Sequence, residues 1–193
     1  VPARQNGNRT APVRQHARIM LLLDGCVQPS LAPQINHATV RVLDALGITA
    51  MSEKSSGCCG AVSYHLNAAD EARTFMRTNI DAWWPAIEKG AEAIIVTASG
   101  CAPMVKEYGR LLAADSAYAD KARRVSELAR DISEIIATEF SREAFAETGG
   151  GARIAFHSPC TLQHGQRITG KVEDILTRLG FNLTTVSNSH LCC

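Results

Sequence analysis

Cysteines are the residues of this sequence whose type and spacing best predict chemistry. Six of the seven cysteines form two matching sets, in which a single cysteine is followed 32 positions later by an adjacent pair. The sets are Cys26 with Cys58 and Cys59, and Cys160 with Cys192 and Cys193. The second set lies 134 positions after the first, and such a fixed offset indicates an internal duplication.

The first set, together with the seventh cysteine, Cys101, offers four thiols that can meet at one site. Thiolates are soft ligands that select zinc or an iron–sulfur cluster over hard cations. Structural zinc sites usually take short Cys-x-x-Cys pairs, which this sequence lacks. Adjacent cysteines crowd a single tetrahedral ion but can bind neighbouring irons of a cluster. The spacing therefore favours iron and sulfur, with zinc as the alternative, and buried structural cysteines as a third reading.

Glycines surround these cysteines. Gly57 and Gly60 flank the adjacent pair, and Gly100 precedes Cys101. Glycine lets the backbone approach a bulky inorganic group closely and directs amide groups toward its sulfurs. We therefore expect both loops to contact a cluster through their backbone.

Composition limits the possible classes of protein. The chain has 193 residues, 46% of them hydrophobic, and 20 basic residues against 19 acidic ones. This size fits one large or two small domains, and the balanced charge argues against nucleic acid as a partner. No apolar run is long enough to span a membrane. An odd number of cysteines and the lack of a secretory signal favour a cytoplasmic protein with reduced thiols.

Alternating strand and helix patterns predict an α/β fold with mostly parallel sheets. Three of the predicted strands are followed closely by a cysteine, and in such folds ligands bind at the carboxyl ends of strands. Helix 33–46 is predicted to turn Ile35, Ala38, Val42 and Leu46 inward, and Asn67 is predicted to cap the next helix. The predicted strands are 19–23, 48–51, 92–97, 154–156 and 183–186, and the predicted helices are 33–46, about 67–82, one with Pro103 in its first turn, 120–140 and about 165–179.

The duplication divides the chain into parts. We expect a linker or disordered arm at 1–17, a first cysteine-rich unit at 18–148, a glycine linker at 149–151 and the incomplete start of a second unit at 152–193. Each unit is predicted to contain a mostly parallel sheet flanked by helices, with the second unit truncated. The absence of an initiating Met leads us to expect that the chain is a piece of a longer protein.

The two cysteine sets resemble the duplicated cysteine-rich CCG domain found in heterodisulfide reductase and in the iron–sulfur subunits of flavin-linked dehydrogenases. From about residue 18 onward, the chain more specifically resembles the iron–sulfur subunits of glycolate oxidases, also called glycolate dehydrogenases. The segments that carry this resemblance are 57–68 (GCCGAVSYHLNA), 79–88 (NIDAWWPAIE), 97–101 (TASGC), 105–109 (VKEYG) and 159–164 (PCTLQH).

The resemblance implies an electron-transfer subunit that passes electrons from an FAD-containing partner, which oxidises glycolate to glyoxylate, toward a quinone or another acceptor. FAD is expected only in the partner subunits, and membrane association only peripherally, at the inner face of the cell membrane. Ala98 stands where the fullest family pattern has a further cysteine, which argues against a five-thiolate cluster. The implied 4Fe-4S ligands are Cys26, Cys58, Cys59 and Cys101, and an incomplete second set is Cys160, Cys192 and Cys193.

Other readings remain open at this point. The cysteines can belong to a zinc-stapled structural or docking module, or to thiol–disulfide chemistry like that of heterodisulfide reductase. The chain can also be the equivalent subunit of a lactate or glycerol-3-phosphate dehydrogenase. No Ser-His-Asp triad, paired carboxylates or dinucleotide fingerprint stands out, so we expect substrate oxidation elsewhere. Four histidines can either bind the metal group or make ordinary structural hydrogen bonds: His65, His157, His164 and His190. Two tryptophans can either contact a partner or belong to the core: Trp83 and Trp84.

Overall fold

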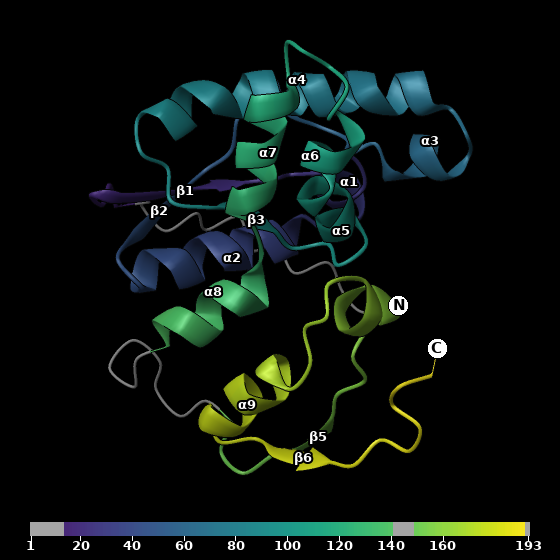
Figure 1. Cartoon of the computed structure of the whole chain (residues 1–193). Coiled ribbons are helices and arrows are strands. Elements are labelled where there is room, and N and C mark those ends of the chain that lie inside the picture. The colour runs from purple at the N-terminus through teal and green to yellow at the C-terminus, as the bar shows by residue number, and fades with distance from the viewer. Residues whose placement is uncertain (1–13, 141–148, 192–193) are drawn as a thin grey trace.

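Two parallel β-sheets of unequal size organise the computed structural model, which describes residues 14–140 and 149–191 (Figure 1). The larger sheet has the strand order β2-β1-β3-β4, and the smaller one pairs β5 with β6. Every strand pair in the described residues is parallel. The strands are β1 (Arg18–Leu22), β2 (Ile48–Met51), β3 (Ile94–Val96), β4 (Ala129–Asp131), β5 (Arg153–Ala155) and β6 (Asn182–Thr184). The predicted α/β class is confirmed.

Helices cover both faces of the larger sheet (Figure 1). On one face lie α4 and the shorter helices α5 to α7, and on the other lie α2 and α8. The helices are α1 (Gln28–Leu31), α2 (Pro33–Ala45), α3 (Ala61–His65), α4 (Ala69–Glu88), α5 (Cys101–Lys106), α6 (Tyr108–Leu111), α7 (Ala119–Leu128), α8 (Ile132–Glu139), the π-helix Thr161–Gly165 and α9 (Lys171–Arg178).

The central strand β1 explains why both faces must be covered. Its side chains alternate between the faces, so that Leu21 packs toward α4 and Met20 and Leu22 pack toward α2. All three are buried, as expected for a parallel strand inside a two-faced sheet. The apolar run that predicted this strand is therefore the centre of the fold.

Helix α2 has nearly the predicted bounds, but its buried face is only partly the predicted one, since Leu46 packs against the core and Ile35 does not. The structure buries Asn36, Thr39 and Leu43, whereas Ile35 is 41% exposed. The helix is rotated by about one residue relative to its apolar pattern, because Asn36 hydrogen-bonds to the loop after β1 and to Thr97 after β3. Polar contacts with these loops thus prevail over the burial of Ile35.

The single helix predicted over 120–140 is wrong. The chain forms α7, leaves the helix at β4, which pairs with β3, and restarts as α8. Asp131 closes a capping box with Glu134 and so begins α8. The helical spacing of apolar residues continues across this break, but Leu128 packs on one face of the sheet and Ile135 on the other. The periodicity therefore could not show the change of face.

Three boundaries in two other helices also differ from the prediction. Asn67 is not the N-cap of α4: the cap is Ala68, and Asn67 has a positive φ of 63°. Helix α4 then runs through Pro85 to Glu88, because Trp83 and Ala86 are buried in the core and hold the last turn in place. The helix predicted over 165–179 is shorter, since Gly170, with a φ of 73°, begins α9.

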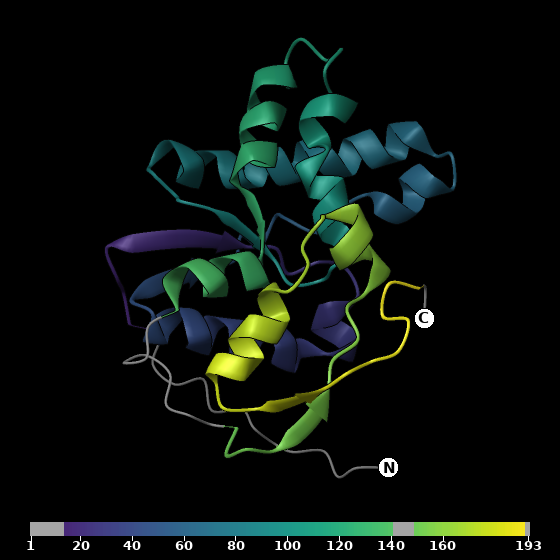
Figure 2. The same ribbon diagram turned by 60° about the horizontal axis from the view of Figure 1, so that its bottom comes forward.

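The second sheet and its helix pack against the first unit. In both views α9 lies beside α8, and the π-helix lies near α5 (Figures 1 and 2). Gln166 donates a hydrogen bond to Asp131, and Thr161 donates one to Ser99. The backbone amide of Gly149, in the predicted glycine linker, donates to the carbonyl of Leu179. The described parts of the two units are thus joined by side-chain hydrogen bonds, and the backbone bond ties the linker to the second unit.

Two further expectations concern the amino-terminal arm and the lack of a membrane span. Residues 1–13 of the predicted arm lie outside the described residues, whereas His16 hydrogen-bonds to Asp44 and to Thr49. Among the helices of 14–140 and 149–191, none combines the length and the apolar character needed to cross a bilayer.

Replacing Asp131 by Ala should lower the free energy of unfolding by about 2 kcal/mol, because the helix cap at Ser133 and the bond from Gln166 are both lost. Urea denaturation monitored by circular dichroism measures this change. The matched control is Asp120→Ala, which removes an exposed carboxylate from the first turn of α7 and should cost less than about 0.5 kcal/mol. Equal losses in the two variants would contradict the capping role.

Candidate metal centre

The loops after β1, β2 and β3 bring the four cysteines of the first unit to the carboxyl edge of the larger sheet. Cys26 follows β1, Cys58 and Cys59 lie between β2 and α3, and Cys101 is the first residue of α5 after β3. Helices α1, α3 and α5, which begin beside these cysteines, all lie at this end of the sheet (Figure 1). Parallel topology thus gathers residues that are up to 75 positions apart in sequence.

The four thiols lie close enough to change one another's protonation. Cys58 interacts with Cys26, and Cys59 interacts with both Cys101 and Cys58. Cys101 is also influenced by the charges of Cys26 and Cys58. The structure therefore groups the four cysteines that the sequence selected, as interacting thiols at one site.

Proton affinity is unevenly divided within this group. The interaction with Cys101 lowers the pKa of Cys59 to about 6, and the same interaction raises the pKa of Cys101 well above its ordinary value. Burial is the main cause that raises the pKa of Cys58. In the metal-free protein, the hydrogen bond between Cys101 and Cys59 thus makes Cys59 the more acidic thiol of the two.

Exposure to solvent also differs across the site. Cys59 is 3% exposed, Cys58 and Cys101 are half-buried, and Cys26 is exposed. The group therefore has a buried side formed by Cys59 and an open side formed by Cys26.

Backbone amides face the sulfurs of the adjacent pair. The N–H of Gly60 donates to Sγ of Cys58 at 3.4 Å, and the amides of Ala61 and of Cys59 itself face the sulfur of Cys59. This turn depends on Gly60, whose φ of +85° is a left-handed conformation. Amides in this arrangement stabilise negative charge on sulfur. The expectation of backbone contacts at the glycine-flanked loop thus has a structural basis at Gly60.

Two buried polar residues that the sequence analysis did not select hold this loop. Asn79 of α4 accepts from the amide of Gly57 at 2.8 Å and donates to the carbonyl of Cys58 at 2.8 Å. Tyr108 of α6 donates to the carbonyl of Cys59 at 2.9 Å. The available signal was an amide on the apolar face of α4, where Met76, Ile80 and Trp83 are also buried.

A second polar network joins the loops after β1, β2 and β3. Asp24 accepts hydrogen bonds from Asn36 and from Ser52, which follows β2. Thr97, at the end of β3, donates to Asn36 and accepts from Gln28 of α1. The backbone positions of Cys26 and Cys101 are thus coupled through side chains near the foot of each loop.

The second cysteine set is only partly described. Cys160 is half-buried and precedes the π-helix, whereas Cys192 and Cys193 lie outside the described residues. Thr161 donates to Ser99 at 2.8 Å, which connects the segment after Cys160 with the loop that carries Cys101. The segment after Cys160 therefore lies beside the loop that carries Cys101.

Four of the remaining candidate side chains have ordinary structural contacts. His164 hydrogen-bonds to the carbonyl of His190, which holds the described carboxyl-terminal segment against the π-helix. His65 makes an edge-on ring contact with Tyr64. Trp83 is fully buried in the core, and the partly buried Trp84 donates to Glu88.

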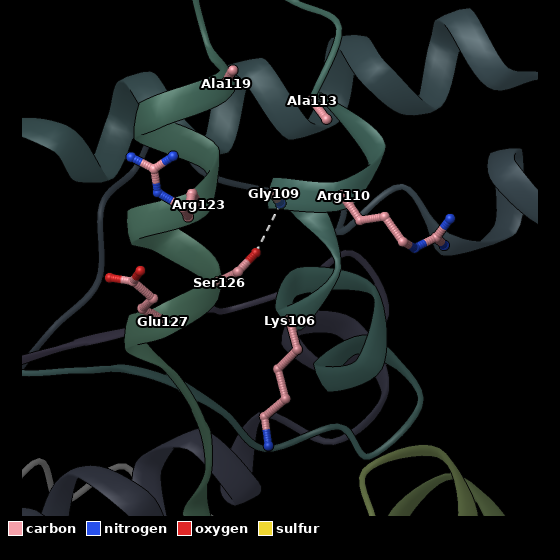
Figure 3. Close-up of a pocket in the computed structure, with 8 residues that line it drawn as sticks. All are labelled: Lys106, Gly109, Arg110, Ala113, Ala119, Arg123, Ser126 and Glu127. Atoms are coloured by element: carbon pink, nitrogen blue, oxygen red, sulfur yellow. Dashed lines mark hydrogen bonds between the residues drawn. The ribbon is translucent and has the colours of Figure 1, made fainter.

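A cleft of about 500 Å³ lies elsewhere, between α6 and α7 (Figure 3). Its cationic groups are paired: Lys106 with Glu134, Arg110 with Glu107 and Arg123 with Asp120. Figure 3 shows Ser126 of α7 bonded to the amide of Gly109 across the cleft. These pairings satisfy the charges of the cleft, so the cysteine group stays the candidate site.

The donor set fits an iron–sulfur cluster by its chemistry. It consists of four soft sulfurs, with three amides directed at two of them. Within 14–140 and 149–191, no three His, Cys, Asp or Glu side chains are arranged around a single metal ion. The fit therefore rests on ligand type and on the amides rather than on a preformed coordination geometry.

Replacing Gly60 by Ala should lower the free energy of unfolding by about 1–3 kcal/mol. A Cβ there would lie 3.0 Å from the carbonyl oxygen of Ala72, and its φ strains any L side chain. Gly57→Ala is the matched control, because a Cβ at Gly57 meets no heavy atom within 4 Å and its φ is not positive. Thermal unfolding of the two variants measures the difference, and a Gly57→Ala loss as large as that of Gly60→Ala would refute the explanation.

Replacing Thr97 by Val should cost about 1–3 kcal/mol of unfolding free energy, because the buried amide of Asn36 loses a hydrogen-bond donor. The control is Thr78→Val, which removes an exposed hydroxyl bonded within its own helix and should change the free energy by less than about 0.5 kcal/mol. Denaturant titration of both variants gives the comparison. A neutral Thr97→Val variant would show that the network does not stabilise the loops.

Comparison with known proteins agrees with this geometry. Residues 20–106 match the family model of the cysteine-rich domain CCG. The whole chain is 54% identical to the glycolate oxidase iron-sulfur subunit of Escherichia coli K12, and it covers 47% of that protein. It is 27% identical over 176 residues to lactate utilization protein A of Anoxybacillus flavithermus, and 23% identical over 172 residues to that of Bacillus subtilis 168, covering 68% of each.

The chain thus spans about half the length of the glycolate oxidase relative, although all 193 of its own residues take part in the match. The matched range 20–106 contains most of β1, all of β2 and β3, and all four interacting cysteines of the first unit. Residues 20–106 thus match the cysteine-rich domain CCG, in a chain that is similar throughout to the iron–sulfur subunit of a glycolate oxidase.

Proposed function

We propose that this chain belongs to an iron–sulfur electron-transfer subunit of a flavin-linked glycolate oxidase. The observation that carries the proposal is the convergence of four interacting cysteines at the carboxyl edge of the sheet, inside the CCG match. The 54% identity to a glycolate oxidase iron–sulfur subunit directs the choice of enzyme.

In this proposal Cys26, Cys58, Cys59 and Cys101 hold one 4Fe-4S cluster. When bound, such a cluster accepts and releases single electrons. The chain contributes the four thiolates, and amides such as that of Gly60 offset their negative charge. The buried side at Cys59 limits access of water, and the open side at Cys26 faces solvent. Cys160, Cys192 and Cys193 are proposed ligands of a second, incomplete set.

Electrons are proposed to come from FAD-containing subunits that oxidise glycolate, with no flavin in this chain. Exposed apolar side chains beside the cysteines support contact with a partner protein at this edge. Val27 and Leu31 follow Cys26 and are 56% and 79% exposed, and Val62 and Leu66 of α3 follow Cys59 and are 65% and 76% exposed. We further propose a cytoplasmic location, with membrane contact only through the complex.

The similarity to lactate utilization protein A supports a second candidate, the equivalent subunit of a lactate-oxidising system. The much higher identity to the glycolate oxidase subunit favours glycolate. Adding each substrate to the complete complex distinguishes the two candidates. Bleaching of the iron–sulfur absorption by glycolate but not by lactate supports the glycolate oxidase subunit.

Anaerobically purified protein should contain about four irons per chain and show a broad visible absorption that dithionite bleaches. Cys59→Ser should lose most of this iron, because it replaces the most buried thiolate of the set. The control is Ser56→Ala, which removes a hydroxyl that bonds only to the carbonyl of Glu53 in the same loop. Iron-free protein with stoichiometric zinc would establish the zinc-stapled module instead.

Disulfide chemistry at the adjacent pair needs a separate test. Metal-free protein should show no reduction of an added disulfide beyond that of Cys59→Ser under the same conditions, because Cys59 is only 3% exposed and an added disulfide cannot reach its sulfur. Rapid, Cys59-dependent reduction in the absence of metal would favour a thiol–disulfide function over electron relay.

A further inference from the structure

We propose that Asn79 and Tyr108 are positioning residues that fix the peptide groups of Cys58 and Cys59, and so set the reduction potential of the group these cysteines hold. The identity of that group as an iron–sulfur cluster rests on the proposed function. The fixing of the peptides itself rests only on contacts within the described chain.

The two side chains form one closed network around the adjacent cysteines. The amide oxygen of Asn79 accepts from the N–H of Gly57, and its nitrogen donates to the carbonyl of Cys58 and, at 3.1 Å, to the hydroxyl of Tyr108. That hydroxyl in turn donates to the carbonyl of Cys59. Three consecutive residues, Gly57 to Cys59, are thus each held by one backbone bond to this pair.

The geometry of the peptide bond turns these contacts into control of the sulfur environment. In a trans peptide the C=O and the following N–H point in opposite directions. Because the carbonyls of Cys58 and Cys59 point to Asn79 and Tyr108, the amides of Cys59 and Gly60 point the other way, toward the sulfurs. The hydrogen bonds on the core side therefore determine which way the amides on the sulfur side face.

Burial makes this arrangement rigid. Asn79 is 1% exposed and Tyr108 is 0% exposed, so neither can exchange its partners for water. Burying an amide and a phenol is unfavourable unless their hydrogen bonds are satisfied, and here the bonds that satisfy them go to the cysteine loop or to each other. A purely apolar pair would fill the same volume without orienting the loop. The role of the polar atoms of Asn79 and Tyr108 is thus to orient the loop that carries Cys58 and Cys59.

Amides directed at cluster sulfurs favour the reduced state, because an added electron increases the negative charge that they stabilise. Without the Tyr108 hydroxyl, the carbonyl of Cys59 loses its donor, and the peptide that carries the Gly60 amide is freer to rotate. The group then has weaker support from amides in its reduced state, and its reduction potential should become more negative.

The experiment compares the full chain with three variants, purified anaerobically. Tyr108→Phe removes one hydroxyl and keeps the ring, and Asn79→Ala removes both of the loop bonds made by Asn79. The control is Tyr118→Phe, which removes a tyrosine hydroxyl bonded to exposed Asp81 and remote from the cysteine loop in sequence. The measurements are iron content, reduction potential from an EPR-monitored redox titration, and hydrogen exchange of residues 57–61 in the metal-free protein.

We expect Tyr108→Phe to retain iron, to have a more negative potential and altered EPR g-values, and to exchange the amides of residues 57–61 at least about tenfold faster. Asn79→Ala should lose more than half of its iron with an unchanged far-UV circular dichroism spectrum. Tyr118→Phe should match the unmodified protein in every measurement. If Tyr108→Phe unfolds, the iron content and exchange of Asn79→Ala decide the matter.

The outcomes separate this inference from the proposed function. An iron-loaded protein whose potential, g-values and loop exchange are the same in Tyr108→Phe as in Tyr118→Phe would overturn the positioning role and leave the cluster in place. A protein that binds no iron, but whose loop exchange rises in Tyr108→Phe, would overturn the iron–sulfur function and support the fixing of the peptides.

Discussion

Mutual repulsion among negative sulfurs is the constraint on which the rest of this structure depends. Thiolates that share a site resist ionisation together: the pKa of Cys101 is raised by its hydrogen bond to Cys59, by burial and also by the charges of Cys59, Cys26 and Cys58. A protein that gathers four thiols must therefore hold them by other means until a positive centre compensates their charge. Parallel strands supply the coarse placement here, and hydrogen bonds from Asn79, Tyr108 and Asn36 fix the loops that carry the cysteines.

The two fixing networks have a common design. Each uses a polar side chain on the buried face of a long helix: Asn79 on α4 and Asn36 on α2. The two helices cover opposite faces of the sheet, so the cysteine loops are held from both sides. A buried asparagine on each helix therefore connects the core with the site.

The sequence could predict the strands and the grouping of cysteines because both follow from local patterns. The apolar run of β1 and the spacing of Cys26, Cys58 and Cys59 need no knowledge of distant contacts. Asn36 and Asn79 could not be assigned in this way, because their partners lie in loops that become neighbours only after folding. The division of 120–140 by β4 was missed for a similar reason: a strand of three residues is specified by its pairing with β3.

The unequal burial of the four cysteines gives the site a direction. A centre held between Cys59 and Cys26 would exchange ligands with solvent mainly on the side of Cys26. Cys59 is buried in the core, whereas Cys26 is exposed. Small oxidants and incoming metal would reach the same side first. Oxidative damage and metal loading of such a centre would thus both take place at the exposed Cys26 side. A protein that covers Cys26 would block the access of oxidants and of metal alike.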